Sequence, residues 1–330
     1  MSATKESGKI IFISLMGNLA LAVAKFVCYL LSKSPSMLAE TIHTSGDTFN
    51  QFLILIGNKQ GQIGPCHRYP MGRGRAAYVF NLLASVGIFI GALYTIYHGI
   101  HALMNLGHHE KIELNIYSFV VLGLSIVIEG YVFSSAYRGI MKNKGEKSFF
   151  LYLKEADDPS IIGILFEDGI AIFGSLVAIL GIAISYQTQS ILPDAVTALI
   201  IGAMLILMAV FLFKLNYSLI VGAALPRREQ EKIKKFILTN SFVDEILHMT
   251  TEVLAPGKVR LSVEVEFHGH HLGNQKNLRR TLEKIKKNDS KALADVRNSA
   301  IRTLGSAINE LEEQITNQFP NIVVIDLEPY

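Results

Sequence analysis

Apolar residues are concentrated in the first two thirds of the chain, where they form six stretches long enough to cross a membrane as helices. Each stretch holds about 20 or more mostly apolar residues, the length that a helix needs to span about 30 Å of hydrocarbon. They run over about 9–32, 35–58, 77–104, 114–137, 159–185 and 193–216. The first lacks a small-residue cleavage site and similar stretches follow it, so we expect a span there and no removable signal peptide. The pattern predicts a six-helix transmembrane domain over residues 1–222.

The last third of the chain is polar and has the pattern of a small mixed domain, residues 223–330. A charged helical stretch precedes Asn240, and apolar and polar residues alternate strictly from Val259 to Phe267, which predicts a half-buried strand. Further strands are predicted at 246–254 and 321–328, and further helices at 274–287 and 290–317. This α-β-β-α-β order suits an α+β domain with helices on one face of a sheet.

Charge and cysteine content narrow the function classes. With 31 Lys and Arg against 28 Asp and Glu, the net charge of +3 is too small a basic excess for a nucleic-acid binder, which presents a clustered positive face. We therefore expect no nucleic-acid partner. The two cysteines, Cys28 and Cys66, form neither a disulfide framework nor a metal-binding CxxC pair. Lys and Arg gather in the 59–76 and 138–158 loops, whereas the opposite loops hold only Lys33 and Lys111. Cytoplasmic loops carry the basic excess, so both termini should face the cytoplasm of a multi-pass membrane protein, in the inner membrane if the source is bacterial.

Ionisable residues inside the predicted spans are the strongest functional signal, because a charge near the bilayer centre costs about 2.5–3.5 kcal/mol even on a lenient scale. The second span contains Glu40, His43, Asp47 and Asn50. His43 and Asp47 are four residues apart and so share one helix face, from which both can reach one cation. The fifth span contains Glu167 and Asp168 with no Lys or Arg beside them. A hydrogen-bonded structural cluster would explain either group alone, but both together favour a divalent-metal site within the membrane.

Two further buried charges leave alternatives open. Glu129 in the fourth span is either a proton site or an extra metal ligand, or it is a neutral carboxyl bonded to a hydroxyl such as that of Ser125. Lys25 in the first span is either a counter-ion to Glu129 or Glu40, or it extends its amine toward the membrane interface.

Several motifs resemble the cation diffusion facilitator family of proton-coupled divalent-metal exporters. They are HTSGD in the second span, RYPMGRGR before the third and PDAVTALIIG at the start of the sixth. The chain is most similar to the mitochondrial zinc-transporter-like branch, in Glu167-Asp168, in the Ser125–Gly130 segment around Glu129, and in Asp326-Leu327-Glu328. The resemblance implies a six-helix bundle with a cytoplasmic ferredoxin-like, metallochaperone-like domain that pairs with its copy as a homodimer. It also implies export of a divalent metal as substrate, with no resident cofactor.

The resemblance implies that His43, Asp47 and Asp168 are metal ligands. One ligand position of the family is not matched in this sequence. Most members have a second His or Asp four residues before the fifth-span Asp, and here that residue is Ile164. The fourth ligand must then be water, Glu167, Glu40 or Asn50. A shell with one nitrogen and mostly oxygen suits zinc, expected first from the family, and also manganese or iron(II). Because ligands must lose protons to bind metal, His43, Glu129 and Glu167 are expected to couple transport to protons.

Other histidines give weaker signals. In the tail, His248, His268, His270 and His271 either form a secondary zinc site or belong to a solvated turn. In the 59–76 loop, Tyr69 and Arg73 stand where many relatives carry histidines beside His67, so we expect no metal site there.

Two rival functions complete the expectations. Ile164 makes a transport-inactive scaffold an alternative, and metal binding at His43 and Asp47 would exclude it. A membrane metalloenzyme is the other, although the chain has neither an HExxH nor a GxSxG motif.

Overall fold

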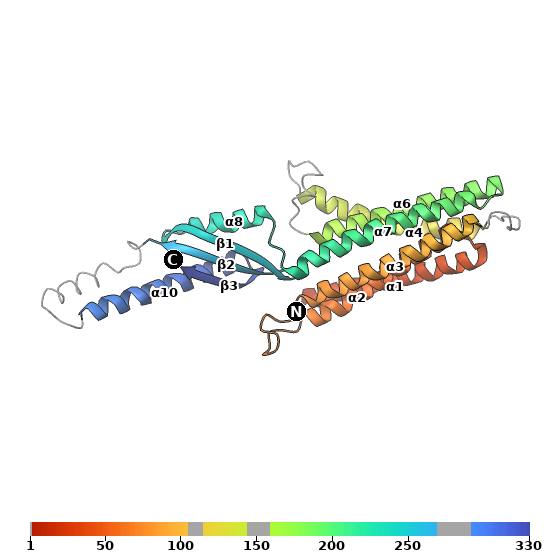
Figure 1. Ribbon diagram of the computed structural model, residues 1–330. Helices are drawn as coiled ribbons and strands as arrows, with labels where there is room; N and C mark the ends of the chain where they lie inside the picture. The colour runs from red at the N-terminus through yellow and green to blue at the C-terminus, as the bar shows by residue number, and fades with distance from the viewer. Residues whose placement is uncertain (1, 105–114, 144–158, 269–291) are drawn as a thin grey trace. The chain divides into compact units, whose positions relative to one another are not determined.

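The computed structural model describes residues 2–104, 115–143, 159–268 and 292–330, and it divides them between two compact units, Met1–Val221 and Gly222–Tyr330. Side chains are described for residues 15–104, 115–135, 137–141, 165–268 and 294–330. The first unit is a bundle of long helices and the second a small sheet with helices (Figure 1). Each unit is described by itself.

Six helices form the described part of the first unit, and they coincide with the six predicted spans to within a few residues at most ends. They are α1 (Ser2–Ser32), α2 (Pro35–Gly61), α3 (Ala76–Met104), α4 (Ile116–Asn143), α6 (Pro159–Thr188) and α7 (Leu192–Val221). The largest differences are at α1, which begins seven residues earlier, and α4, which ends six later. Helix α2 packs against α1, α3, α6 and α7, so it is the most enclosed helix of the bundle.

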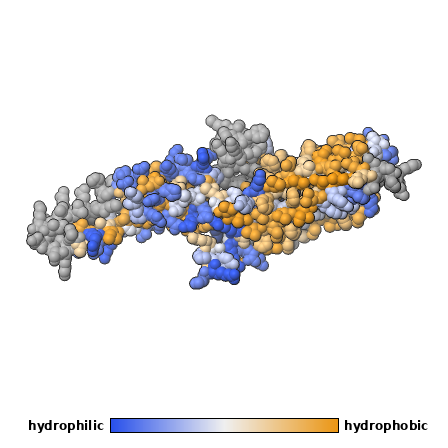
Figure 2. All heavy atoms as spheres, in the orientation of Figure 1, coloured by the Kyte–Doolittle hydropathy of each residue, from blue (hydrophilic) through white to orange (hydrophobic). Residues whose placement is uncertain are grey.

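Among the described residues, five helices are long and apolar enough to cross a membrane: α1, α3, α4, α6 and α7. Their outward faces are covered with apolar side chains (Figure 2). Helix α2 is not among the five, because its central residues include Glu40, His43 and Asp47. Its helical neighbours shield these groups, and Glu40 and His43 are 0% and 2% exposed.

Small residues let the bundle helices approach closely. The buried core of the unit contains Ala39, Ala92, Ala178, Ala198 and Ala209 beside larger apolar side chains. At Gly57 of α2, an added Cβ would lie 2.9 Å from the Cα of Ala77 in α3, so this contact depends on glycine. Close approach of this kind is how helices associate in membranes, where no hydrophobic driving force acts between them.

The starts of α2 and α7 are joined by buried hydrogen bonds. Asp194 in the first turn of α7 accepts hydrogen bonds from the Ser36 hydroxyl and from the Ser36 backbone amide, the latter at 3.3 Å. Ser34 caps α2 by accepting from the Met37 amide. Asp194 is therefore a second, long-range acceptor for the orphan donors at this helix start.

The second unit confirms the three predicted strands of the tail. Its described elements are α8 (Arg227–Leu238), β1 (Val243–Ala255), β2 (Lys258–Phe267), α10 (Ala292–Gln318) and β3 (Ile322–Pro329). The strand order is β1-β2-β3, with β1 antiparallel and β3 parallel to β2. The alternation in β2 is confirmed, because Val259, Leu261, Val263 and Val265 are buried against α8 and α10 side chains such as Ile237 and Leu311. The helix predicted at 274–287 lies outside the described residues.

Candidate metal-binding site

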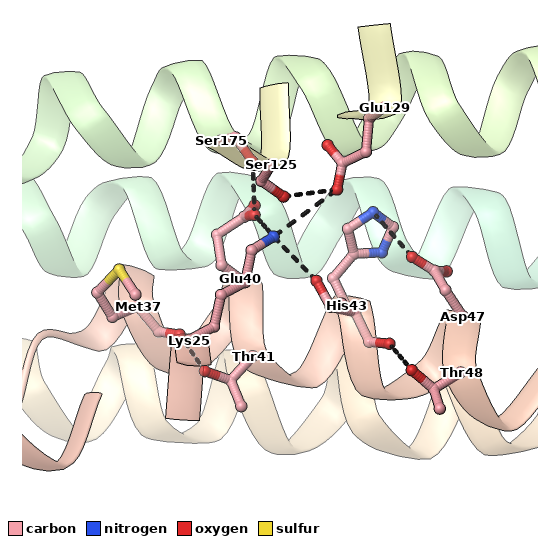
Figure 3. Close-up of polar contacts among 11 residues, drawn as sticks. Lys25, Met37, Glu40, Thr41, His43, Asp47, Thr48, Ser125, Glu129 and Ser175 are labelled. Carbon is pink, nitrogen blue, oxygen red and sulfur yellow. Dashed lines mark hydrogen bonds and ion pairs between the residues drawn. The ribbon is translucent and has the colours of Figure 1, made fainter. Parts of the chain in front are cut away.

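Polar side chains from α1, α2, α4 and α6 meet inside the first unit (Figure 3). Helix α2 is central, because its helical spacing buries Glu40, His43, Thr44 and Asn50 and places Asp47 one turn after His43. Two neighbouring groups can be distinguished. One surrounds Lys25, and the other contains His43, Asp47 and the acids of α6.

His43 and Asp47 face one another one helical turn apart, as the sequence predicts. The His43 Nε2 atom lies 3.7 Å from the Asp47 Oδ2 atom, which is too long for a hydrogen bond. Both imidazole nitrogens are buried and without a hydrogen-bond partner, and so is Asp47 Oδ1. His43 also lines a largely apolar cavity of about 270 Å³ between α2, α3 and α7.

The acids of α6 lie beside this pair. Glu167 accepts a hydrogen bond from Asn50 Nδ2 at 3.2 Å, and its carboxyl neighbours that of Asp47. Asp168 lies within electrostatic range of Asp47, and its Oδ2 atom is buried without a partner. Side chains of the two helices therefore approach each other from opposite sides of one polar region.

The described side chains do not form a finished metal shell as they stand. Among the residues with described side chains, no three His, Cys, Asp or Glu groups lie close enough together to hold a metal ion. Asn50 is engaged by Glu167, and Glu40 by Lys25 and Ser175. Ile164 lies in α6, but its side chain is outside the described part of the chain.

Lys25 resolves one open alternative, because it is a counter-ion to both acids and not an interfacial lysine. Its side chain is fully buried, with Nζ 2.9 Å from Glu40 Oε2 and 3.8 Å from Glu129 Oε1. Glu129 also accepts a hydrogen bond from Ser125 at 2.7 Å, the hydroxyl partner that the sequence suggested. Sequence spacing could not single out this arrangement, since Lys25, Glu40 and Glu129 come from three helices.

The tail histidines are only partly described. His248 lies on β1 and is exposed, and His268 follows β2, where its Nδ1 atom is 3.4 Å from Asp244 Oδ2. His270 and His271 lie outside the described residues. In the 59–76 loop, the Arg73 Cζ atom lies 4.5 Å from the centre of the Tyr69 ring. This cation–π contact stabilises a turn of the loop.

Comparison with known proteins gives one family and several similar proteins that match most of this chain. A model of the cation efflux transmembrane domain matches residues 11–221. Metal tolerance protein C4 of Arabidopsis thaliana is 27% identical over 99% of this chain and 74% of its own length. A mitochondrial proton-coupled zinc antiporter of Homo sapiens is 28% identical over 98% of this chain, which spans only 59% of that protein. An uncharacterized transporter of Methanocaldococcus jannaschii is 23% identical over 79% of this chain.

Proposed function

The chain belongs to the cation diffusion facilitator, or cation efflux, family of membrane transporters, and from this premise we propose that it exports a divalent metal cation in exchange for protons. The cargo site we propose consists of His43 and Asp47 of α2 and Asp168 of α6, with Glu167 or water as the fourth ligand. Family membership makes the protein a transporter and not the membrane metalloenzyme considered above.

The observation that carries this proposal is the set of unpartnered buried polar atoms. Both ring nitrogens of His43, Asp47 Oδ1 and Asp168 Oδ2 lack a hydrogen-bond partner. Leaving one such atom buried and unpaired costs about 1–3 kcal/mol, so several in one region call for a missing partner. One dication between α2 and α6 would take a single His43 nitrogen together with oxygen atoms of Asp47 and Asp168, after side-chain rotations bring these ligands onto it. The other ring nitrogen would point away from that ion.

The donor set allows more than one metal. One imidazole and two or three carboxylates form a harder shell than the nitrogen- and sulfur-rich sites of structural zinc, and manganese or iron(II) would also fit. We propose zinc first, because the human relative is named as a zinc antiporter.

Proton exchange follows from the same ligands. Metal binds deprotonated carboxylates and neutral imidazole, so binding releases protons and proton uptake releases metal. His43 and Glu167 are the coupling groups we propose within the cargo site, and Glu129 is a third beside it. An acidic outer compartment would then drive export from the cytoplasm.

The proposed topology keeps α2 as a sixth span although it is less apolar than the other five. Its flanking helices α1, α3, α6 and α7 provide the apolar surroundings that its own side chains do not. The basic residues before α3 support a cytoplasmic 59–76 loop and cytoplasmic termini. A homodimer through the tail domain remains part of the proposal.

Transport into reconstituted vesicles with a pH gradient tests this function. Zinc, manganese, iron(II), cobalt and nickel would be offered to the native chain, to Asp47→Ala and to Asp168→Ala. Glu313→Ala, at an exposed position of α10, is the control. We expect uptake of at least one metal with proton counterflow, lost in both site variants and kept in the control. No uptake by folded native protein would overturn the proposal and favour the scaffold alternative.

A further inference from the structure

Lys25 is the one lysine or arginine on the membrane helices that is fully buried among the described side chains. A buried ammonium loses its hydration, so its retention inside an apolar bundle needs compensation from neighbouring groups. Figure 3 shows its amine pointing into the polar region between α2 and α4, where dashed lines join it to Glu40 and Glu129. The position raises the question of what this fixed charge does next to the proposed cargo site.

The oxygen atoms around the amine are arranged as a cation shell. Lys25 Nζ donates to Glu40 Oε2 and to Thr44 Oγ1, both at 2.9 Å, and lies 3.8 Å from Glu129 Oε1. Two carboxylates and a hydroxyl from two helices thus converge on one positive centre. Hard dications are bound by the same donor types in proteins.

Two serines fix the carboxylates in this arrangement. Ser175 of α6 donates to Glu40 Oε2 at 2.8 Å, and Ser125 of α4 donates to Glu129 Oε1 at 2.7 Å. Each serine binds the same oxygen that faces the amine. The two serine hydrogen bonds therefore fix the orientation of the carboxylates, as outer hydrogen-bond partners orient the ligands of a metal ion.

Two carboxylate oxygens of this shell have no hydrogen-bond partner even with the ammonium group present. Glu40 Oε1 and Glu129 Oε2 are buried without a hydrogen-bond partner. Two carboxylates face a single positive charge, so a dication would match them better than the amine does. What prevents a metal from entering is the amine itself, which fills the centre.

We propose that Lys25 is a tethered cation that occupies a second cation site, formed by Glu40, Thr44 and Glu129, and so limits each chain to one cargo ion. The inference rests on the proposed function, because it concerns the site next to the cargo ligands. Lys25 also lies within electrostatic range of Asp47, so its fixed charge opposes entry of further cations into the same polar region. Glu40 is thereby kept out of the cargo shell.

Counting zinc ions on the purified full chain tests the proposal. Equilibrium dialysis against free Zn²⁺, followed by elemental analysis, would be applied to the native chain, Lys25→Met and Lys25→Met/Glu129→Gln. Native protein should bind one more zinc ion than Asp47→Ala, and Lys25→Met should bind one more than native. The added ion should disappear in the double variant, which lacks one carboxylate of the second site. Lys25→Arg keeps the charge and Lys214→Met alters an exposed lysine of α7, so both should match native.

The outcomes separate the two proposals. An unchanged count in folded Lys25→Met, with native protein binding at Asp47, overturns the tethered-cation inference and leaves the transport function intact. A native chain that binds no zinc at Asp47, with a gain in Lys25→Met, overturns the proposed cargo site and the limit to one cargo ion. It leaves only the second cation site at Glu40 and Glu129. If Lys25→Met unfolds in metal-free buffer, zinc must restore its folding, because a bound dication replaces the amine. Failure of zinc to restore folding also overturns the inference.

Discussion

Glu40 and Lys25 form a fully buried ion pair that joins α2 to α1, with 2.9 Å between Glu40 Oε2 and Lys25 Nζ. Removing one partner of such a pair costs about 3–5 kcal/mol, since it leaves the other charge buried. We therefore expect Glu40→Gln to be strongly destabilising, near the lower end of that range because Glu129 remains within 3.8 Å of the amine.

A double-mutant cycle measures the coupling of this pair. The loss in Lys25→Met/Glu40→Gln should be smaller than the sum of the two single losses, because both members of the pair leave together and Glu129 keeps its hydrogen bond from Ser125. Unfolding in mixed micelles by increasing denaturing detergent provides the free energies. Additive effects of the two substitutions would show that the ion pair contributes nothing to stability.

Asp194 gives a second stability prediction, through the joint between α7 and α2. Asp194→Ala removes the acceptor of the Ser36 amide and hydroxyl and leaves buried donors unpaired, at a cost of about 1–3 kcal/mol. Asp194→Asn keeps a carbonyl oxygen and should lose less. Thermal unfolding of the three proteins checks the order, and equal losses in Ala and Asn would contradict it.

A third stability prediction concerns Gly57, where α2 and α3 are in close contact. An added Cβ would lie 2.9 Å from a backbone atom, Ala77 Cα, so Gly57→Ala must push the helices apart. We expect a loss of about 1–3 kcal/mol, typical of overpacking. Gly123→Ala in α4 is the matched control, because nothing lies within 4 Å of its added Cβ. Equal melting temperatures for Gly57→Ala and Gly123→Ala would contradict this prediction.

The tail offers a contrasting ion pair. Arg260 Nε lies 2.6 Å from Asp326 Oδ2, but both side chains are more than a third exposed. The hydrogen bond and charge of Asp326 raise the pKa of Arg260, so the pair's contribution is present below the ordinary arginine pKa and is lost only in strongly alkaline solution. Arg260→Gln should leave the melting temperature unchanged at physiological salt, with no pH dependence between about pH 5 and pH 9. A clear drop at neutral pH would contradict this.

The sequence predicts the elements well and the long-range contacts poorly. Hydrophobic stretches define the six helices, and alternation defines β2, because both patterns are local and periodic. The i, i+4 spacing likewise places His43 and Asp47 together. Lys25 and Asp194 are different, since their partners lie 15 and 158 residues away and only packing selects them. The distance between the proposed α2 ligands and Asp168 likewise depends on how α2 and α6 pack. Residue spacing along the sequence does not determine that packing.

X-ray absorption at the zinc edge of the loaded full chain tests the central claim most directly. We predict a first shell of one imidazole nitrogen and oxygen donors at about 2.0–2.2 Å, with the imidazole signal lost in His43→Gln. A shell with two or more imidazoles, or one unchanged in His43→Gln, would place the metal elsewhere and contradict the proposed cargo site.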